Sequence, residues 1–373
     1  MLYRRSTGRD HHRRVVATTL AILSTLAVAV PASAQDTITT SASAGSTFKW
    51  VDEPVTFEAG GIKIYATFRH PVDDPAPVPG VLLIAGSGPT DRNGNSPLEA
   101  GKVDTIKTLA DWLSQDGVAS LRYDKLGSGQ TGLGPFATKV NAIGIKPFEQ
   151  ESLAALVFLA AQKGIDAQRL GVFGHSEGAL FALLLATGHA GHAPAIHALG
   201  LFEPLSLRYL TLITVQVRAQ VAAQLTSGEI TKKLATTVDA TLAKAVTTLR
   251  ATGKVKADLP YGLDSILNPS TATFLYQADQ FDPETLAASL APHTPVIVSC
   301  STSDLQVSCS QVQRVVRGLE RAQAITRFVR LVGVDHVLKV DSTGSALNYT
   351  KDLPFSPVLK TAIKEFVEQS LAR

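Results

Sequence analysis

The chain has few cysteines and, after its first 34 residues, no excess of positive charge. It contains only two cysteines in 373 residues, and two cysteines do not form a zinc site by themselves. The formal net charge is +3, but residues 1–34 contribute five arginines against one aspartate, so the rest carries a net charge of −1. A nearly neutral chain has no basic surface for nucleic acid or an anionic membrane. We therefore expect no nucleic-acid partner.

The first 34 residues have the pattern of a secretory signal. Five arginines lie beside an apolar run over residues 15–30, and an Ala-Ser-Ala site ends at Ala34. This pattern predicts cleavage after Ala34. An uncleaved anchor is the alternative, although about 16 apolar residues are short for a bilayer span. The Arg13-Arg14 pair leaves twin-arginine export open. We expect a periplasmic or extracellular protein that has no membrane association after cleavage.

The rest of the chain alternates between strands and helices. Residues 35–50 are rich in serine, threonine and alanine and predict a mobile leader. The later pattern predicts strands over residues 51–57, 62–68, 81–85, 118–121, 170–173, 196–202, 296–299 and 326–331, and helices over residues 104–116, 149–163, 177–187, 310–321 and 358–371. Such alternation builds a mostly parallel sheet with helices on both faces. We expect this α/β core in two parts, residues 51–203 and 293–373.

The alternation stops between residues 204 and 292. Apolar residues there recur at helical spacing in two stripes, from Leu210 to Leu225 and from Ile230 to Leu249, separated by a Ser-Gly turn. Two amphipathic helices in a hairpin are therefore expected. We interpret residues 204–292 as a helical cap inserted into the core. Whether they act as extra core helices or as a mobile lid stays open.

One short stretch, residues 170–180, indicates a nucleophile. An apolar run meets the sequence Gly174-His175-Ser176-Glu177-Gly178 and continues into Ala/Leu-rich sequence. A strand, a sharp G-x-S-x-G turn and a helix form a nucleophile elbow. The two glycines are needed because a Cβ atom at either position would collide with the strand or the helix. Ser176 is therefore the candidate nucleophile.

A serine nucleophile needs a histidine base and an acid that orients the base. In a fold with this elbow the partners follow the serine in the order acid, then histidine, on loops after later strands. Four histidines after Ser176 come too early for that order, namely His189, His192, His197 and His293. His336 directly follows the last strand and fits it, the alternative being an ordinary surface-loop histidine.

The acid has three candidates after the serine. Asp304 comes just past the strand that ends at Ser299, and it is the favoured one. Glu203 ends an earlier strand and is the competitor. Asp335 adjoins His336, but adjacent residues of an extended loop tend to point apart.

The two cysteines lie on either side of the favoured acid. Cys300 precedes Asp304 by a few residues, and Cys309 follows it. Exported proteins meet oxidising conditions in which disulfides persist. A Cys300–Cys309 disulfide that fixes the acid loop is therefore expected.

The oxyanion of a tetrahedral intermediate needs hydrogen-bond donors. The backbone N–H of Glu177, after the nucleophile, is one expected donor, and the backbone N–H of Ser87, in the loop over residues 86–95, is the other. This glycine-rich loop lacks both G-x-G-x-x-G and a Gly-Lys-Ser/Thr ending, which argues against phosphate binding.

Two polar clusters follow strands at the same sheet edge. Asp91, Arg92 and Asn93 are expected to hold their own loop together, with substrate contact as the alternative. Asp124 and Lys125 are expected to pair with each other within the next loop.

Five ordered segments resemble those of bacterial α/β-hydrolases of the serine esterase and serine aminopeptidase-like group. They are GSGPTDRNGN at 86–95, RYDKLGSG at 122–129, GHSEG at 174–178, SDLQV at 303–307 and the loop of Asp335 and His336. The resemblance implies the α/β-hydrolase fold, carboxylesterase activity on short acyl esters, and a triad of Ser176, Asp304 and His336. Many members have aspartate in place of Asn93 and arginine in place of Leu126, which puts the loop's salt bridges in doubt.

The expected function is that of an exported serine esterase acting through an acyl-enzyme. Its partner is a small-molecule ester, and the reaction requires no metal or organic cofactor. An acyltransferase or a small-peptide hydrolase would use the same triad, and a non-catalytic protein of the same fold would bind an apolar ligand. The sequence makes no prediction of oligomeric state.

Overall fold

The computed structural model describes residues 40–41, 49–72 and 76–371. The expected signal, residues 1–34, lies outside the described residues. So does most of the expected leader, residues 35–50, of which only 40–41 and 49–50 are described. Residues 40–41 form a short strand.

The described residues divide into two compact units. The helical unit comprises Arg208–Phe281 together with Thr138–Ile145, and the sheet unit contains the other described residues. These limits differ from the expected insertion over residues 204–292. The segment from Asp282 onward belongs to the sheet unit, and Thr138–Ile145 joins the helical unit.

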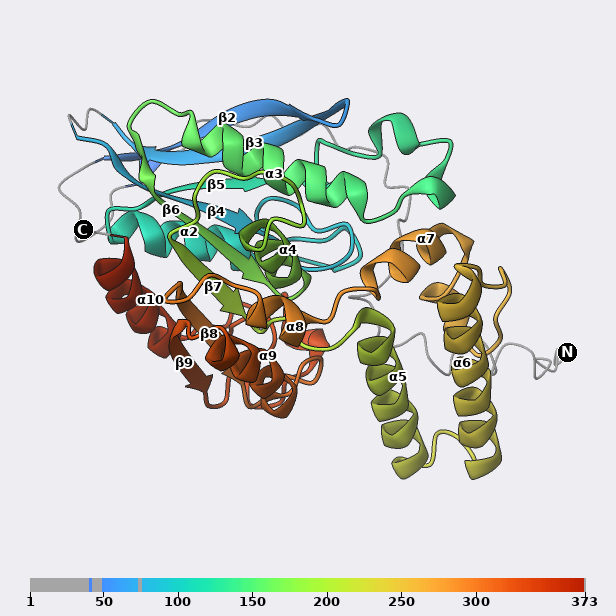
Figure 1. Ribbon diagram of the computed structural model, residues 1–373. Helices are drawn as coiled ribbons and strands as arrows, with labels where there is room; N and C mark the ends of the chain where they lie inside the picture. The colour runs from blue at the N-terminus through green and yellow to red at the C-terminus, as the bar shows by residue number, and fades with distance from the viewer. Residues whose placement is uncertain (1–39, 42–48, 73–75, 372–373) are drawn as a thin grey trace, which may run out of the picture. The chain divides into compact units, whose positions relative to one another are not determined.

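The sheet unit is built on one mostly parallel sheet (Figure 1). Within the described residues its strands are β1 (Thr40–Ser41), β2 (Trp50–Ala59), β3 (Ile62–Pro71), β4 (Val78–Ile84), β5 (Ala119–Tyr123), β6 (Ile165–His175), β7 (Ala198–Phe202), β8 (Pro295–Ser301) and β9 (Ile325–Leu331). Their order is β1-β2-β3-β5-β4-β6-β7-β8-β9. The strands β5, β4, β6, β7, β8 and β9 pair in parallel with one another in this order. At one edge, β1, β2 and β3 are added in antiparallel pairing.

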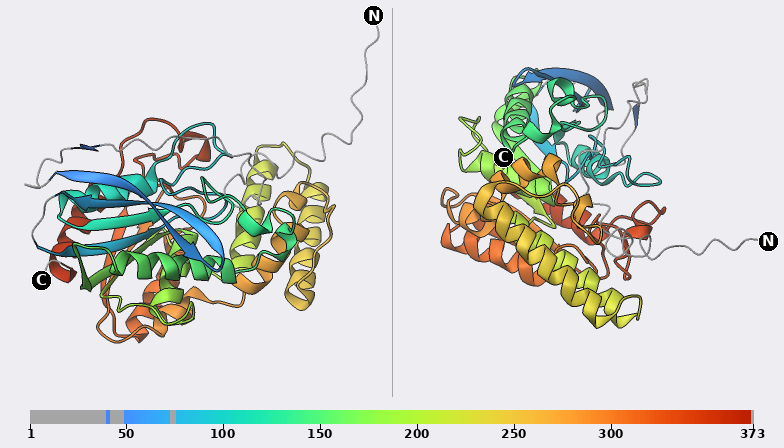
Figure 2. Two further views of the ribbon diagram at one scale, coloured as in Figure 1. Left: turned by 90° about the horizontal axis from the view of Figure 1, so that it is seen from above. Right: turned by 90° about the vertical axis from the view of Figure 1, so that its right-hand side faces the viewer.

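Helices cover both faces of this sheet, as expected. The helices of the sheet unit are α2 (Thr105–Gln115), α3 (Lys146–Ala160), α4 (Glu177–Ala186), α8 (Pro283–Ala288), α9 (Cys309–Arg321) and α10 (Pro357–Ser370). One face carries α2 and α10, and the other carries α3, α4 and α9, with α8 packed on α4 and α9 (Figures 1 and 2).

Alternate residues of the central strands are buried on opposite faces of the sheet, under the helices of each layer. Val81 and Leu83 of β4 are buried among α2 and α10, while Leu82, between them, is buried outside that cluster. Phe173 of β6 packs edge-on against Phe202 of β7, with ring centroids 5.6 Å apart, and also meets Phe366 of α10. An unbroken apolar strand is typical of a parallel sheet covered on both sides.

The helical unit contains the expected hairpin. Its helices are α5 (Tyr209–Thr226), α6 (Lys232–Thr252) and α7 (Pro269–Ala278). The expected apolar stripes of α5 and α6 are largely buried, from Leu210 to Val221 and from Val238 to Leu249. In the described part of the chain, no helix has the length and apolar character needed to cross a membrane.

A buried aspartate joins the helices of this unit. The carboxylate of Asp279, which is fully buried, lies 2.8 Å from Nε of Arg250 on α6 and 3.2 Å from Nη2 of Arg208, just before α5. It also accepts a hydrogen bond from the backbone N–H of Leu210 at 2.8 Å. Asp279 therefore connects the ends of α5, α6 and α7.

Candidate active site

Ser176 occupies the expected turn between β6 and α4. Its backbone has φ 54° and ψ −117°, a conformation that costs free energy in any residue except glycine. Two backbone hydrogen bonds hold the turn. The N–H of Ser176 donates to the carbonyl of Phe202 at 2.9 Å, and the carbonyl of Ser176 accepts from the N–H of Leu205 at 3.0 Å. The side chain is half-buried.

The two glycines of the elbow have no room for a side chain. A Cβ atom on Gly174 would lie 2.2 Å from the carbonyl oxygen of Gly178, in the first turn of α4. A Cβ atom on Gly178 would lie 2.2 Å from the carbonyl oxygen of Ile84 in β4. The sharp turn therefore depends on glycine at both positions.

His336 and Asp304 form a buried pair. Nδ1 of His336 lies 2.7 Å from Oδ2 of Asp304, and the two side chains are 1% and 0% exposed. Burial lowers the pKa of His336, but the charge and hydrogen bond of Asp304 outweigh it, so the pKa is raised above its usual 6.5. Nε2 of His336 is buried and has no hydrogen-bond partner among the described residues. Nδ1 is thus the donor, and Nε2 is left as the acceptor.

The residue before the nucleophile is tied to the histidine loop. Nε2 of His175 lies 2.8 Å from the carbonyl oxygen of His336, and the ring centroids are 5.0 Å apart. Burial and the neighbouring His336 lower the pKa of His175 to about 3, so this ring is neutral and its Nε2–H donates to the carbonyl. The bond connects the elbow to the loop after β9.

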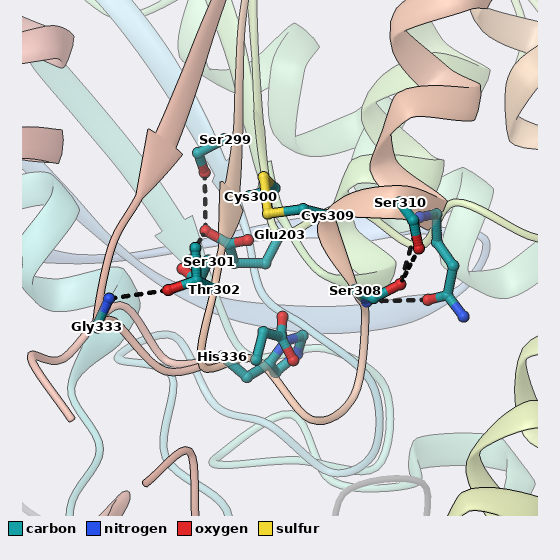
Figure 3. The surroundings of a disulfide bond; sticks show 12 residues. Glu203, Ser299, Cys300, Ser301, Thr302, Ser308, Cys309, Ser310, Gly333 and His336 are labelled. Carbon is teal, nitrogen blue, oxygen red and sulfur yellow. Dashed lines mark hydrogen bonds and ion pairs between the residues drawn. A yellow bond between two sulfur atoms is a disulfide. The ribbon is translucent and has the colours of Figure 1, made fainter. Parts of the chain in front are cut away.

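The acid loop is closed by a disulfide, as the sequence predicted (Figure 3). Cys300 of β8 is bonded to Cys309, the first residue of α9. Inside the loop, Oδ1 of Asp304 accepts hydrogen bonds from the backbone N–H groups of Gln306 at 2.7 Å and Val307 at 2.9 Å. These bonds leave Oδ2 directed at His336.

The competing acid, Glu203, lies close to this pair but has different partners. Its Oε1 accepts from the hydroxyls of Ser299 at 3.0 Å and Ser301 at 2.9 Å, as Figure 3 shows. Its Oε2 has no hydrogen-bond partner among the described residues. Burial, followed by the charge of Asp304, raises the pKa of Glu203 well above its usual range. The raised pKa favours the protonated form of Glu203 at neutral pH.

Asp335 turns away from the neighbouring imidazole. Its Oδ1 accepts from the backbone N–H groups of Val337 at 3.1 Å and Lys339 at 2.8 Å, which holds its own loop. Burial raises its pKa to about 6. The structure thus places Asp304, and neither Glu203 nor Asp335, in hydrogen bond with His336.

The loop after β4 reaches the elbow. A Cβ atom on Gly86 would lie 3.4 Å from Cβ of Ser176 and 3.3 Å from Nδ1 of His175. Ser87, the next residue, is buried, and its carbonyl accepts from the hydroxyl of Thr90 at 2.7 Å. The two expected oxyanion donors, Ser87 and Glu177, therefore belong to two segments that adjoin Ser176.

The polar clusters are organised partly as expected. Oδ1 of Asp91 accepts from the backbone N–H groups of Asn93 and Asn95, so Asp91 does hold its own loop. Arg92 instead leaves its loop and forms a buried ion pair with Asp124 at 2.7 Å.

The expected pairing of Asp124 with Lys125 is wrong. Adjacent side chains on this loop point apart, so Asp124 meets Arg92, while Nζ of Lys125 donates to the carbonyl of Gly86 and lies 3.2 Å from Oε1 of Glu177. The sequence placed Lys125 at the carboxyl edge of the sheet but did not predict its contacts with Gly86 and Glu177.

Comparisons with known proteins agree with this architecture. No protein-family model matches the chain, and no curated protein matches it in sequence. Among solved structures, Est1E from Butyrivibrio proteoclasticus with ferulic acid bound is 17% identical, with a TM-score of 0.52 over 86% of this chain and 100% of that chain. The esterase Pf2001 of Pyrococcus furiosus is 14% identical, with a TM-score of 0.51 over 91% and 99% of the two chains.

A third similar structure is the acylaminoacyl peptidase of Pyrococcus horikoshii. It is 15% identical, with a TM-score of 0.51 over 86% of this chain and 42% of that chain. The chain has the α/β-hydrolase fold. At these low identities the likeness establishes the fold alone. The loops that carry Ser176, Asp304 and His336 follow β6, β8 and β9 at the carboxyl edge of the parallel strands, where such folds carry their sites.

Proposed function

We propose that this α/β-hydrolase is a serine esterase that cleaves short acyl carboxylic esters. The observation that carries the proposal is the buried His336–Asp304 pair. Nε2 of His336 has no hydrogen-bond partner among the described residues. The elbow of Ser176 adjoins this pair, because the neighbouring His175 is hydrogen-bonded to the carbonyl of His336. A serine, an acceptor nitrogen and an orienting carboxylate are the parts of acyl transfer.

The proposed reaction has two halves. Ser176 Oγ attacks the ester carbonyl while its proton passes to Nε2 of His336, and Asp304 stabilises the imidazolium that forms. The oxyanion accepts hydrogen bonds from the backbone N–H groups of Ser87 and Glu177. Collapse breaks the bond to the alcohol, which takes the proton from His336. Water, deprotonated by His336, then attacks the acyl-enzyme and releases the acid and the free serine.

The reaction class draws support from the similar structures. Est1E, with ferulic acid bound, and Pf2001, an esterase, share this fold over almost their whole lengths. We extend ester hydrolysis from those proteins to this one as part of the proposal. The Cys300–Cys309 disulfide supports a place of action in an oxidising compartment, in line with export.

The decisive experiment replaces the nucleophile. Wild-type protein is expected to hydrolyse p-nitrophenyl acetate or butyrate, and Ser176→Ala to lose nearly all of that activity. Ser227→Ala is the matched control, because Ser227 is an exposed serine in the turn after α5. A fluorophosphonate probe should label wild type stoichiometrically and Ser176→Ala not at all. Unchanged turnover in Ser176→Ala would overturn the assignment.

The same experiment separates the other functions. Labelling of Ser176 in one sample and, in an unlabelled sample, release of the ester's alcohol with transfer of its acyl group to an added alcohol or amine in place of water would identify an acyltransferase. Release of amino acids from short peptides would identify a peptidase, the activity named for the Pyrococcus horikoshii structure. Absence of labelling would identify a non-catalytic ligand-binding protein.

A further inference from the structure

A buried lysine joins the two segments that supply the proposed oxyanion donors. Lys125 follows β5 and is 1% exposed. Its Nζ donates to the carbonyl oxygen of Gly86 and lies 3.2 Å from Oε1 of Glu177. Gly86 directly precedes Ser87, and Glu177 is the first residue of α4. One ammonium group therefore contacts both donor segments.

The lysine itself is held rigidly. The backbone N–H and the hydroxyl of Ser128 both donate to the carbonyl of Lys125 at 2.9 Å. The next backbone N–H, that of Leu126, donates to Oε2 of Glu151 at 2.9 Å. Burial raises the pKa of Glu151 to about 8, so this second carboxyl is mostly protonated at neutral pH. The carboxylate that forms an ion pair with Lys125 Nζ is that of Glu177, at 3.2 Å.

Peptide geometry turns the Lys125–Gly86 bond into a constraint on the neighbouring donor. The carbonyl of Gly86 and the N–H of Ser87 belong to one peptide group, which is trans, so they point in opposite directions. With the carbonyl bound by Lys125, the Ser87 N–H is directed to the other side. This peptide adjoins the elbow, since a Cβ atom on Gly86 would lie 3.4 Å from Cβ of Ser176. A rotated peptide would present a carbonyl where the reaction needs a donor.

We propose that Lys125 is a positioning residue. Through its contacts with Gly86 and Glu177, it keeps the backbone N–H groups of Ser87 and Glu177 directed toward the oxyanion. The inference rests on the proposed function, because an oxyanion hole has a role only if Ser176 forms tetrahedral intermediates. Lys125 does not touch the substrate in this scheme. It prevents the Gly86–Ser87 peptide from rotating and fixes the start of α4.

The test uses a buried cation elsewhere in the sheet unit as the control. Arg69 of β3 is 4% exposed, and its partners include Asp52 at 3.1 Å, Ser114 at 2.9 Å and Asp111 at 3.4 Å, all outside the elbow and its neighbouring loop. Lys125→Met and Arg69→Met each remove a buried charge. Only the first removes a contact to the donor segments.

Two readouts separate positioning from stability. The first is the kcat and KM for p-nitrophenyl acetate. The second is the Ki of an alkyl trifluoromethyl ketone, which adds to the serine hydroxyl to give a tetrahedral oxyanion. Lys125→Met is expected to lower kcat by about 10²-fold and to raise Ki by a similar factor, while KM stays within about threefold. Arg69→Met is expected to leave kcat and Ki unchanged at temperatures where circular dichroism shows it folded.

A Lys125→Met variant with wild-type kcat or wild-type Ki would overturn the inference. If that variant does not fold, Lys125→Arg takes its place, because a planar guanidinium cannot reproduce the point contact of an ammonium. An unchanged Ki in Lys125→Arg would then overturn it. Wild-type hydrolysis that is lost in Ser176→Ala establishes the proposed function separately. If wild type hydrolyses no ester, the proposed function fails and the inference fails with it.

Discussion

Nδ1 of His336 is hydrogen-bonded to Oδ2 of Asp304 at 2.7 Å, and neither side chain is exposed by more than 1%. Asp304→Asn keeps the size of the side chain and removes its charge, so the imidazolium loses its stabilisation and the ring loses its tautomer preference. We expect kcat for p-nitrophenyl acetate to fall by about 10³ to 10⁴-fold. A fall smaller than about tenfold in a variant with a native circular dichroism spectrum would argue against Asp304 as the acid.

The pH dependence of the reaction should follow His336, which must be neutral to take the serine proton. Its pKa is raised, so kcat/KM should increase with pH and reach half its maximum above pH 6.5. The groups that face it are Asp304, Glu203, Asp335 and the neutral His175. Asp335→Asn removes one negative charge and should move the midpoint to lower pH. A midpoint below 6.5 in the wild type would contradict this account.

Glu203→Gln is the counterpart to Asp304→Asn. A glutamine matches the protonated acid and accepts at Oε1 from the same two serines, so kcat should stay within about threefold of wild type. Stability supplies a second readout. The folded state holds the Glu203 proton to a higher pH than the unfolded state does, because its folded pKa is raised.

Linkage then gives the sign of the effect. The wild-type free energy of unfolding should decrease as the pH rises from about 4.5 through that raised pKa, because the folded state binds the extra proton. In Glu203→Gln this contribution is absent. Urea denaturation at pH 5 and pH 8 should therefore show a smaller difference for the variant. An equal difference in both proteins would show that Glu203 is already ionised in the folded state.

The disulfide should contribute to both stability and activity. Cys300 and Cys309 are nine residues apart, and the double serine variant should lower the free energy of unfolding by about 2–3 kcal/mol. A lower kcat is also expected, because the bond closes the loop that orients Asp304. A reductant should produce the same changes in wild type and none in the double variant. Equal thermal stability of reduced and oxidised wild type would contradict the prediction.

Most of the elements, and the residues that meet in the candidate site, were predictable from the sequence. The buried strands β4 and β6 are short apolar runs, and the elbow is defined by two glycines around Ser176. The order of acid and histidine along the chain then selects Asp304 and His336. The strands and the elbow depend on a few neighbouring residues, and the choice of acid and histidine adds their order along the chain.

The limits of the helical unit were not predictable in this way. Residues 138–145 join it through contacts to α7, where Ile145 N donates to Oε1 of Gln277 at 2.9 Å and Thr273 Oγ1 donates to the carbonyl of Asn141 at 2.8 Å. The two residues of each pair are 132 positions apart in the chain, so no periodic pattern in the sequence predicts their contact.

Two short helices were missed although their start signals are present. Asn268 caps α7 and Asp282 caps α8, and each is followed by a proline at the first helical position. The Asp124–Lys125 error has another cause. Adjacent side chains of a loop point apart, as those of Asp335 and His336 do, so Asp124 and Lys125 contact different partners.

The backbone of Ser176 implies a trade-off between stability and activity at a single position. A serine at φ 54° and ψ −117° is strained by roughly 1–3 kcal/mol, which the folded state must offset with contacts elsewhere. Glycine would adopt this conformation without strain but carries no nucleophile. An inactive Ser176→Gly protein that resists unfolding better than wild type would therefore measure how much stability this chain gives up to hold one hydroxyl in place.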